Sequence, residues 1–187
     1  ALGLCFLGTN QSMQPISGQI RLHHQRLDQE ATVEVSAPIV CSANGATLAL
    51  RGFSRFGDRP VSTADDARSI LEAYAHSGSA FLSELNGPFA LVIHVPASGK
   101  ALIAIDRMGI ERLTWARQDD LLVIGTSAED VARRLSGAAQ LASPANFDFV
   151  LGHMVPAPQT VFKAVRKLGP GSAIEFNGAR VREFRHW

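Results

Sequence analysis

The sequence predicts an α+β domain in which two mainly antiparallel sheets pack face to face and helices cover their outer sides, a four-layer αββα sandwich. Two observations favour this class. Residues 89–95 and 101–105 are nearly continuous apolar runs around Pro96-Ala97-Ser98-Gly99, which predicts a hairpin covered on both faces. Amphipathic helices alternate with such buried strands along the chain. A generic α+β domain is the alternative architecture.

The first half of the chain is expected to supply strands. Residues 2–7 form a short apolar run, residues 31–35 alternate, and residues 47–50 are apolar again. Gly, Pro, Asn or Ser bounds each run, which favours strands joined by turns.

Two helices are expected between these strands and the central hairpin. Thr63 precedes an acidic first turn that ends at Asp66, and apolar residues then recur at helical spacing up to Gly78. A second, short helix begins at Ser79 and ends at Asn86-Gly87-Pro88, since Gly tolerates a left-handed C-cap and Pro cannot continue the hydrogen-bond ladder.

The second half repeats this order. Residues 113–116 and 121–125 predict a hairpin around Asp119-Asp120, and Ser127 is expected to cap a helix with an acidic first turn. Further elements are a helix over 145–153, with Phe147, Val150 and Leu151 on one face, and strands over 161–165, 172–176 and 180–184. The default interpretation of the scattered phenylalanines is core packing, namely Phe53, Phe56, Phe89, Phe147, Phe149, Phe162, Phe176 and Phe184.

The composition limits the kinds of partner that the chain is expected to bind. With 187 residues, 46% of them hydrophobic, the chain is long enough for one sizeable core and falls in the range of a single domain. A net charge of +1 from 18 basic and 17 acidic residues indicates neither a nucleic-acid nor a membrane partner. No apolar run approaches the roughly 20 residues that span a bilayer. Cys5 and Cys41 lie in apolar surroundings, which favours buried thiols in a reducing, cytoplasmic setting.

No independent catalytic or metal-binding set emerges from the sequence. The histidines are scattered, and the adjacent His23 and His24 would point to opposite faces of a strand, so no metal site is expected. The segment Gly169-Pro170-Gly171 lacks the Lys and Ser/Thr of a phosphate-binding loop, so no nucleotide cofactor is expected in this domain.

An ordered set of motifs covers residues 63–187. They are Thr63-Ala64-Asp65-Asp66, Leu85-Asn86-Gly87-Pro88-Phe89-Ala90, the stretch from Ile105 to Leu113, Gly125-Thr126-Ser127, and the run from Pro170 to Trp187. In this order they resemble the N-terminal class II glutamine amidotransferase domain, of the Ntn hydrolase type, in asparagine synthetase-like enzymes. The first sixty residues are more divergent.

The resemblance implies a site that has lost its chemistry. The family uses an N-terminal Cys activated by its own α-amino group, and Leu2 stands at that position. Cys5 lies inside an apolar run with no adjacent α-amine, which favours a core thiol over a nucleophile. The pair Arg51-Gly52 stands where the family has the Asn-Gly of its oxyanion hole, and a long guanidinium does not reproduce a short amide.

Two further positions are candidates for a vestigial glutamine pocket. Arg26 matches the arginine that holds the glutamine carboxylate, with a surface cation as the alternative. Asp66 matches the aspartate that binds the substrate amine, with a helix cap as the alternative. No catalytic residue is therefore predicted.

The resemblance further implies that residues 1–187 form the N-terminal part of an ATP-dependent amide-forming ligase, similar to β-lactam synthetases or lasso peptide cyclases. A C-terminal synthetase domain in the same polypeptide would then be the partner and would bind ATP and Mg²⁺. A peptide or a small-molecule carboxylate would be the substrate. The alternatives are a stand-alone binding or interaction module without catalysis and an active glutaminase.

Overall fold

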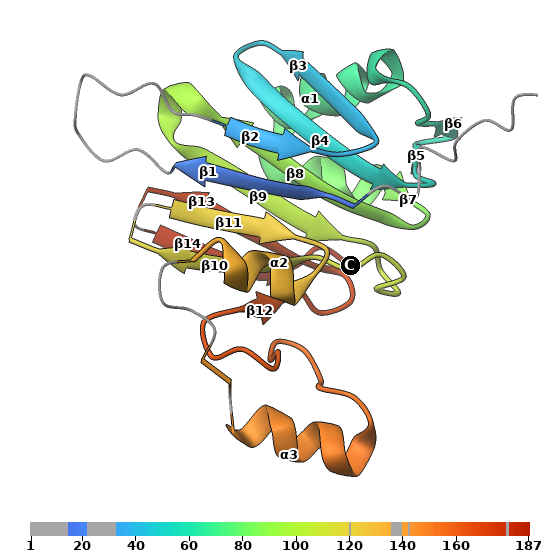
Figure 1. Cartoon of the computed structure of the whole chain (residues 1–187). Coiled ribbons are helices and arrows are strands. Elements are labelled where there is room, and N and C mark those ends of the chain that lie inside the picture. Colours follow the sequence, from blue (N-terminus) through green and yellow to red (C-terminus); the bar gives the residue numbers. More distant parts are fainter. Residues whose placement is uncertain (1–14, 22–32, 120, 136–139, 142, 179) are drawn as a thin grey trace, which may run out of the picture.

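The computed structural model describes residues 15–21, 33–119, 121–135, 140–141, 143–178 and 180–187. Two large antiparallel sheets form the centre of the molecule (Figure 1). The predicted strand over residues 2–7 and the histidine pair at 23 and 24 lie outside the described residues.

One sheet has six strands. In spatial order they are β14 (Arg180–Arg185), β13 (Ser172–Asn177), β9 (Lys100–Ile105), β8 (Phe89–Val95), β4 (Ala46–Gly52) and β3 (Ile39–Ala43). Every pairing is antiparallel. The predicted hairpin of β8 and β9 is its centre.

The second sheet has five strands. In spatial order they are β12 (Arg166–Lys167), β10 (Thr114–Gln118), β11 (Leu121–Gly125), β1 (Ser17–Arg21) and β2 (Val33–Ser36). A small sheet of β6 (Arg59–Pro60), β5 (Arg55–Phe56) and β7 (Leu85–Asn86) lies at one end of the larger one.

Three hydrophobic clusters separate four layers. The first lies between the six-stranded sheet and the pair α1 (Ala64–Ser77) and η2 (Gly78–Glu84), a 3-10 helix. The second lies between the two sheets, and the third lies between the five-stranded sheet and α2 (Ala128–Arg133). The predicted αββα sandwich is therefore confirmed. A 3-10 turn, η3 (Pro96–Ser98), joins β8 to β9.

The N-terminus of α1 is the predicted capping box. The Asp66 backbone N–H donates to Thr63 Oγ1 at 3.2 Å, and the Thr63 backbone N–H donates to Asp66 Oδ2 at 2.9 Å. The helix then buries Ala67, Ile70 and Leu71 against the sheet.

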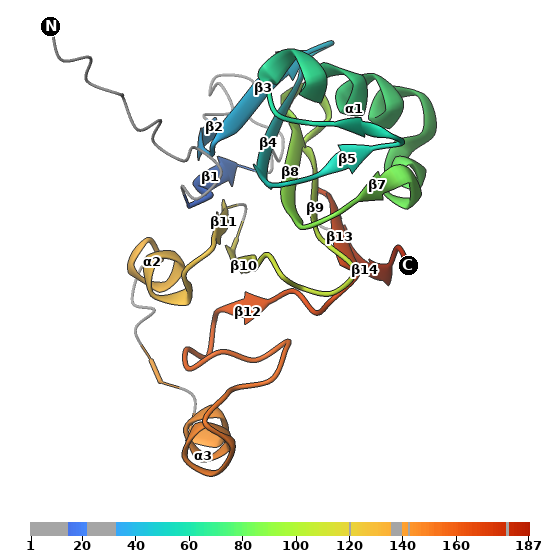
Figure 2. The same ribbon diagram turned by 90° about the vertical axis from the view of Figure 1, so that its right-hand side faces the viewer.

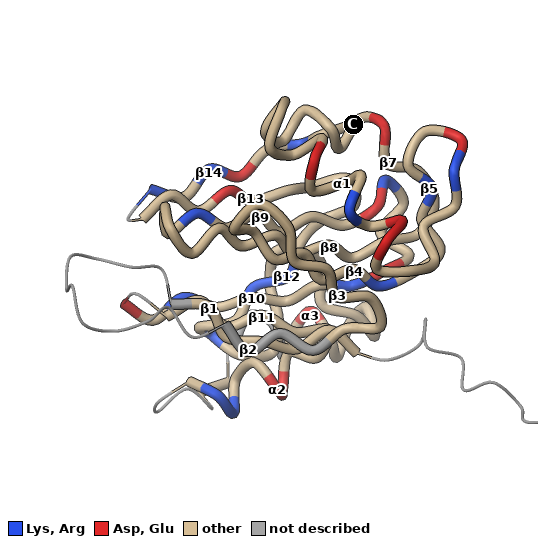
Figure 3. Tube along the Cα trace, turned by 90° about the horizontal axis from the view of Figure 1, so that it is seen from above, with Lys and Arg blue, Asp and Glu red and all other residues tan. Residues whose placement is uncertain are grey.

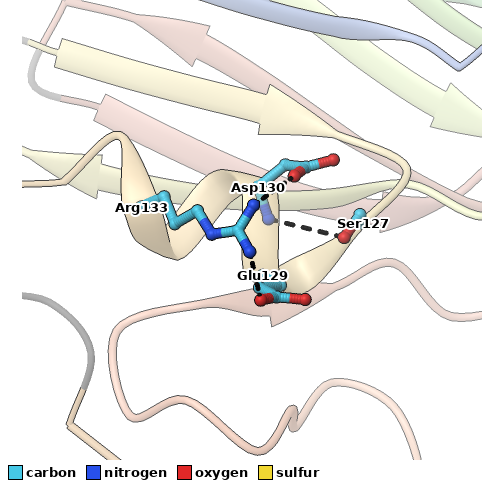
Figure 4. A network of polar contacts seen from close by, with 4 residues as sticks. All are labelled: Ser127, Glu129, Asp130 and Arg133. Atoms are coloured by element: carbon cyan, nitrogen blue, oxygen red, sulfur yellow. Dashed lines mark hydrogen bonds and ion pairs between the residues drawn. The ribbon is translucent and has the colours of Figure 1, made fainter.

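The cap of α2 is also confirmed (Figure 4). The backbone N–H of Asp130 donates to Ser127 Oγ at 3.4 Å, and Arg133 forms an ion pair with Glu129 at 2.5 Å. Basic and acidic residues are interspersed along the described trace (Figure 3).

Helix α3 (Ser143–Gly152) differs from the other two helices. Both views place it beyond β12, away from the two sheets (Figures 1 and 2). Phe147, Phe149, Val150 and Leu151 are exposed on it, and Phe53 is also exposed. The expectation of core packing was therefore wrong for these phenylalanines, because apolar character alone does not tell whether a partner surface faces the helix.

Five strands were missed, namely β1, β3 and the short β5, β6 and β7, and one strand was misplaced. Strands β1 and β3 were not expected, since β3 is half-exposed and its hairpin with β4 depends on Asn44 and Gly45, both at positive φ. Residues 161–165 form no strand; Phe162 makes only an isolated bridge with Leu141, and the pairing strand is β12.

Candidate functional site

The candidate site lies where β4 ends beside the β8–β9 hairpin, and its residues are Arg51, Gly52, Asp106 and Glu111, here called the β4 corner. Gly52 is opposite Phe89 and Arg51 is opposite Ala90 in the sheet register. Because Ala49 faces the second sheet, Arg51, two residues further along the strand, faces the same side. The corner therefore opens at the edge of the core between the sheets.

Gly52 is required by the close approach of two backbones. Its φ is +111°, and a Cβ built at this position would lie 2.3 Å from the carbonyl oxygen of Pro88. No residue with a side chain fits here without moving β4 away from the turn that precedes β8.

Asp106 organises the loop after β9. Its buried carboxylate accepts the backbone N–H groups of Met108 at 3.1 Å, Ile110 at 3.0 Å and Glu111 at 2.9 Å. The Asp106 backbone oxygen accepts the N–H of Gly109 at 3.0 Å and that of Gly171 at 2.9 Å. These bonds fold the loop back and bring Glu111 toward β4.

Glu111 holds Arg51. The guanidinium Nη1 lies 3.2 Å from Glu111 Oε2, and the two side chains are only 19% and 13% exposed. Arg51 Nε is buried without a partner. The charge of Arg51 is therefore balanced by a neighbouring carboxylate, while its Nε–H remains an unpaired buried donor.

Sequence reasoning missed Glu111. The signal in the sequence was the charge of Glu111 near the end of the motif from Ile105 to Leu113, which could have indicated a partner for Arg51. The link between the two became visible only in the sheet register.

Asp66 serves the helix cap. Besides the Thr63 bond, its Oδ2 accepts the backbone N–H and the hydroxyl of Ser62, both at 3.1 Å. These bonds, led by the Ser62 backbone donor, lower the pKa of Asp66 below its usual range. Asp66 therefore has the helix-cap role that was its alternative interpretation, and its place in a glutamine pocket stays a prediction. Leu2, Cys5 and Arg26 lie outside the described residues.

The closing motif of the chain packs beside the β4 corner. His186 Nε2 forms a hydrogen bond with the Ile105 carbonyl oxygen at 2.9 Å, and the His186 backbone N–H donates to Gly171 at 3.0 Å. The Arg107 guanidinium stacks 5.6 Å from the centre of the Trp187 ring. The end of the chain thus braces the loop that carries Asp106.

Two further side chains with reactive groups, Cys41 and His94, are buried in the fold. Cys41 is a buried free thiol, and His94 is buried with neither ring nitrogen hydrogen-bonded, so burial lowers the pKa of His94 to about 4. Within the described ranges, no group of three His, Cys, Asp or Glu side chains is placed to hold a metal ion. None of the described helices is long and apolar enough to cross a membrane.

Two cavities border these elements. A cavity of about 340 Å³ lies between α1 and the β3–β4 hairpin, and one of about 600 Å³ lies between the loop after β9 and the segment that follows α3. Arg51, Gly52 and Asp66 line neither, whereas Glu111 lines the larger one.

Comparison with curated proteins finds no match. Among solved structures, the chain is similar to glutamine phosphoribosylpyrophosphate amidotransferase from B. subtilis, complexed with ADP and GMP, with 16% identity and a TM-score of 0.45 over 78% of this chain. It is also similar to a structure described as the allosteric regulatory enzyme of purine biosynthesis, with 15% identity and a TM-score of 0.45 over 78% of this chain. The chain spans 30% of the length of each of these proteins. The family described as the glutamine amidotransferase domain matches residues 16–187, and the chain belongs to this family.

Proposed function

We propose that this is a catalytically degenerate glutamine amidotransferase domain that does not hydrolyse glutamine. One observation carries the proposal. The Nη1 atom of Arg51, the residue that the resemblance puts at the position of the oxyanion-hole amide, lies 3.2 Å from Glu111 Oε2.

Amide hydrolysis develops negative charge on the former carbonyl oxygen, and catalysis needs free donors aimed at that oxygen. At the β4 corner the guanidinium is already bound to Glu111 through Nη1, and the Glu111 carboxylate beside it would repel a developing oxyanion. The residue at the nucleophile position, Leu2, carries no group that attacks an amide.

The proposed context is an ATP-dependent amide-forming ligase of the asparagine synthetase type, similar to lasso peptide cyclases or β-lactam synthetases, in the cytoplasm. The ordered motifs from Thr63 to Trp187 support this context. ATP and Mg²⁺ would bind a synthetase domain, and this domain would contribute packing and contacts to a carboxylate substrate.

Ammonia release from glutamine tests the degenerate site. The protein at high concentration is expected to release ammonia no faster than buffer does, while an active glutaminase serves as the positive control. Glutamine turnover that thiol alkylation abolishes would contradict the proposal, since it would identify a working cysteine.

The intact mass of the untagged protein, expressed from its own gene, tests the ligase context separately. A mass far above 20.1 kDa is expected, because a synthetase domain would add to this one. A mass close to 20.1 kDa would contradict the ligase context and favour the stand-alone binding module.

A further inference from the structure

The larger cavity, here called the α3 cavity, has the size and walls of a small-molecule site. Its volume of about 600 Å³ lies within the range of ligand pockets, roughly 300–1,000 Å³. Apolar side chains from several segments form much of its wall, among them Ile105, Leu113, Phe149, Met154, Val155 and Leu168. An apolar ligand body would replace water there at a favourable free energy.

Most polar groups of the wall are already satisfied inside the fold. Thr114 donates its hydroxyl to the Gly125 carbonyl at 2.7 Å, and Thr160 donates to the Val165 carbonyl at 2.8 Å. Glu111 is paired with Arg51, so its negative charge is balanced. These groups shape the cavity without leaving a charge in it.

Arg112 and Lys167 are different. They also line the cavity, and the ion pairs formed within the described chain involve neither of them. Lys167 donates one hydrogen bond, to the Val155 carbonyl, which leaves two of its three ammonium protons. The wall therefore carries two cations with which no carboxylate of the described residues forms an ion pair.

The two cations also act on each other. Burial, and then the positive charge of Arg112, lower the pKa of the Lys167 ammonium below its usual range. An anion placed between them would relieve this repulsion and accept hydrogen bonds from both. The Arg112 guanidinium offers the planar fork that matches a carboxylate.

We propose that the α3 cavity binds an amphipathic carboxylate, with its apolar body against Leu113, Val155 and Leu168 and its carboxylate between Arg112 and Lys167. This site is distinct from the β4 corner and does not depend on the absence of glutaminase activity. Two sources share this chemistry, a free aliphatic acid and the C-terminal end of an apolar peptide.

Calorimetric titration of the whole protein with decanoate tests the site, with decanol as the uncharged counterpart. Decanoate is expected to bind, and Arg112→Gln is expected to weaken binding about tenfold, since a charge-assisted hydrogen bond is lost. Arg112 is exposed, so the substitution leaves the core intact. Arg68→Gln, on the exposed side of α1, removes the same charge from a helix that does not line the cavity and is expected to leave the affinity unchanged.

A second arm distinguishes the sources. N-acetyl-Leu-Phe with a free C-terminus is compared with its C-terminal amide, and amide NMR shifts at Leu113 and Thr126 report whether the α3 cavity is occupied. Binding of either acid with these shifts supports the proposal and identifies its source. Equal binding of the uncharged counterparts, unchanged affinity in Arg112→Gln, or no binding by either acid at millimolar concentration would overturn it.

Discussion

The β4 corner and the α3 cavity share Glu111 but use their charges in opposite ways. In the corner, Glu111 neutralises Arg51, and Asp106 binds three backbone amides, so every charge serves the fold. In the cavity, Arg112 and Lys167 face space that apolar side chains enclose. The difference teaches that the charges at the β4 corner are engaged within the fold, while the groups available to a ligand lie beside it.

Gly52→Ala is expected to have the largest effect on the corner. A Cβ at 2.3 Å from the Pro88 oxygen, on a residue with φ of +111°, forces β4 to move, and we expect a loss of about 4 kcal/mol in the free energy of unfolding. Urea unfolding measures this. Gly45→Ala is the matched control, since Gly45 has a φ of +73° but open space around it, and we expect about 1 kcal/mol there. Equal losses in both variants would mean that the close approach is not rigid.

His94 contrasts with the paired charges of the β4 corner, because it is a buried polar group whose two ring nitrogens have no hydrogen-bond partner. Its pKa is lowered from 6.5 to about 4, so the unfolded chain takes up the proton first as the pH falls. Neutral His94 contributes about 3 kcal/mol to the free energy of unfolding above pH 6.5, and this contribution is lost as the pH falls toward 4.

Unfolding titrations between pH 7.5 and 4 measure this loss, compared between the wild type and His94→Leu. The variant is expected to lack most of the decline over this range. A parallel decline in both proteins would assign the pH dependence to other groups.

Asp106→Asn tests whether the loop after β9 depends on the carboxylate. The amide retains one acceptor oxygen and places donors against a backbone N–H, so a loss of about 2 kcal/mol is expected in urea unfolding. Asp119→Asn, in the exposed hairpin turn with a φ of 52°, is expected to be neutral because Asn also tolerates this conformation. An unchanged free energy of unfolding in Asp106→Asn would contradict the conclusion that this carboxylate positions Glu111.

The smallest effect is expected on α3. Leu151 is 69% exposed, so Leu151→Ser is expected to change the free energy of unfolding by less than about 0.5 kcal/mol. Leu82→Ala, at a fully buried position of η2, is expected to cost about 3 kcal/mol in the same assay. A large loss in Leu151→Ser would show that α3 is packed against the rest of the chain.

The sequence predicts best where local chemistry and periodicity agree. The capping box at Thr63 and Asp66 and the apolar hairpin of β8 and β9 are both local patterns, and both are confirmed. Strand β3 was missed because an edge strand with exposed positions such as Val40 has no strong apolar pattern. The exposed face of α3 was missed because a helical pattern carries no information about what packs on it.

At the candidate site too, local patterns could be predicted from the sequence and long-range contacts could not. The resemblance located Arg51 and Gly52, and the structure places both at the end of β4. The helix-cap role of Asp66 could be predicted from its neighbours in the sequence, because a capping box is a local pattern. The pairing of Arg51 with Glu111 joins residues 60 positions apart through the β4–β8–β9 register, so no local pattern contained it.

The most direct test of the account is a double-mutant cycle on Arg51 and Glu111 with Arg51→Met, Glu111→Gln and the double variant. Each single substitution strands a mostly buried polar partner, whereas the double variant removes both, so urea unfolding is expected to give a coupling free energy of about 2 kcal/mol. A coupling near zero would mean that Arg51 is not held by Glu111 and is free to face a substrate, which would contradict a corner whose charges serve the fold.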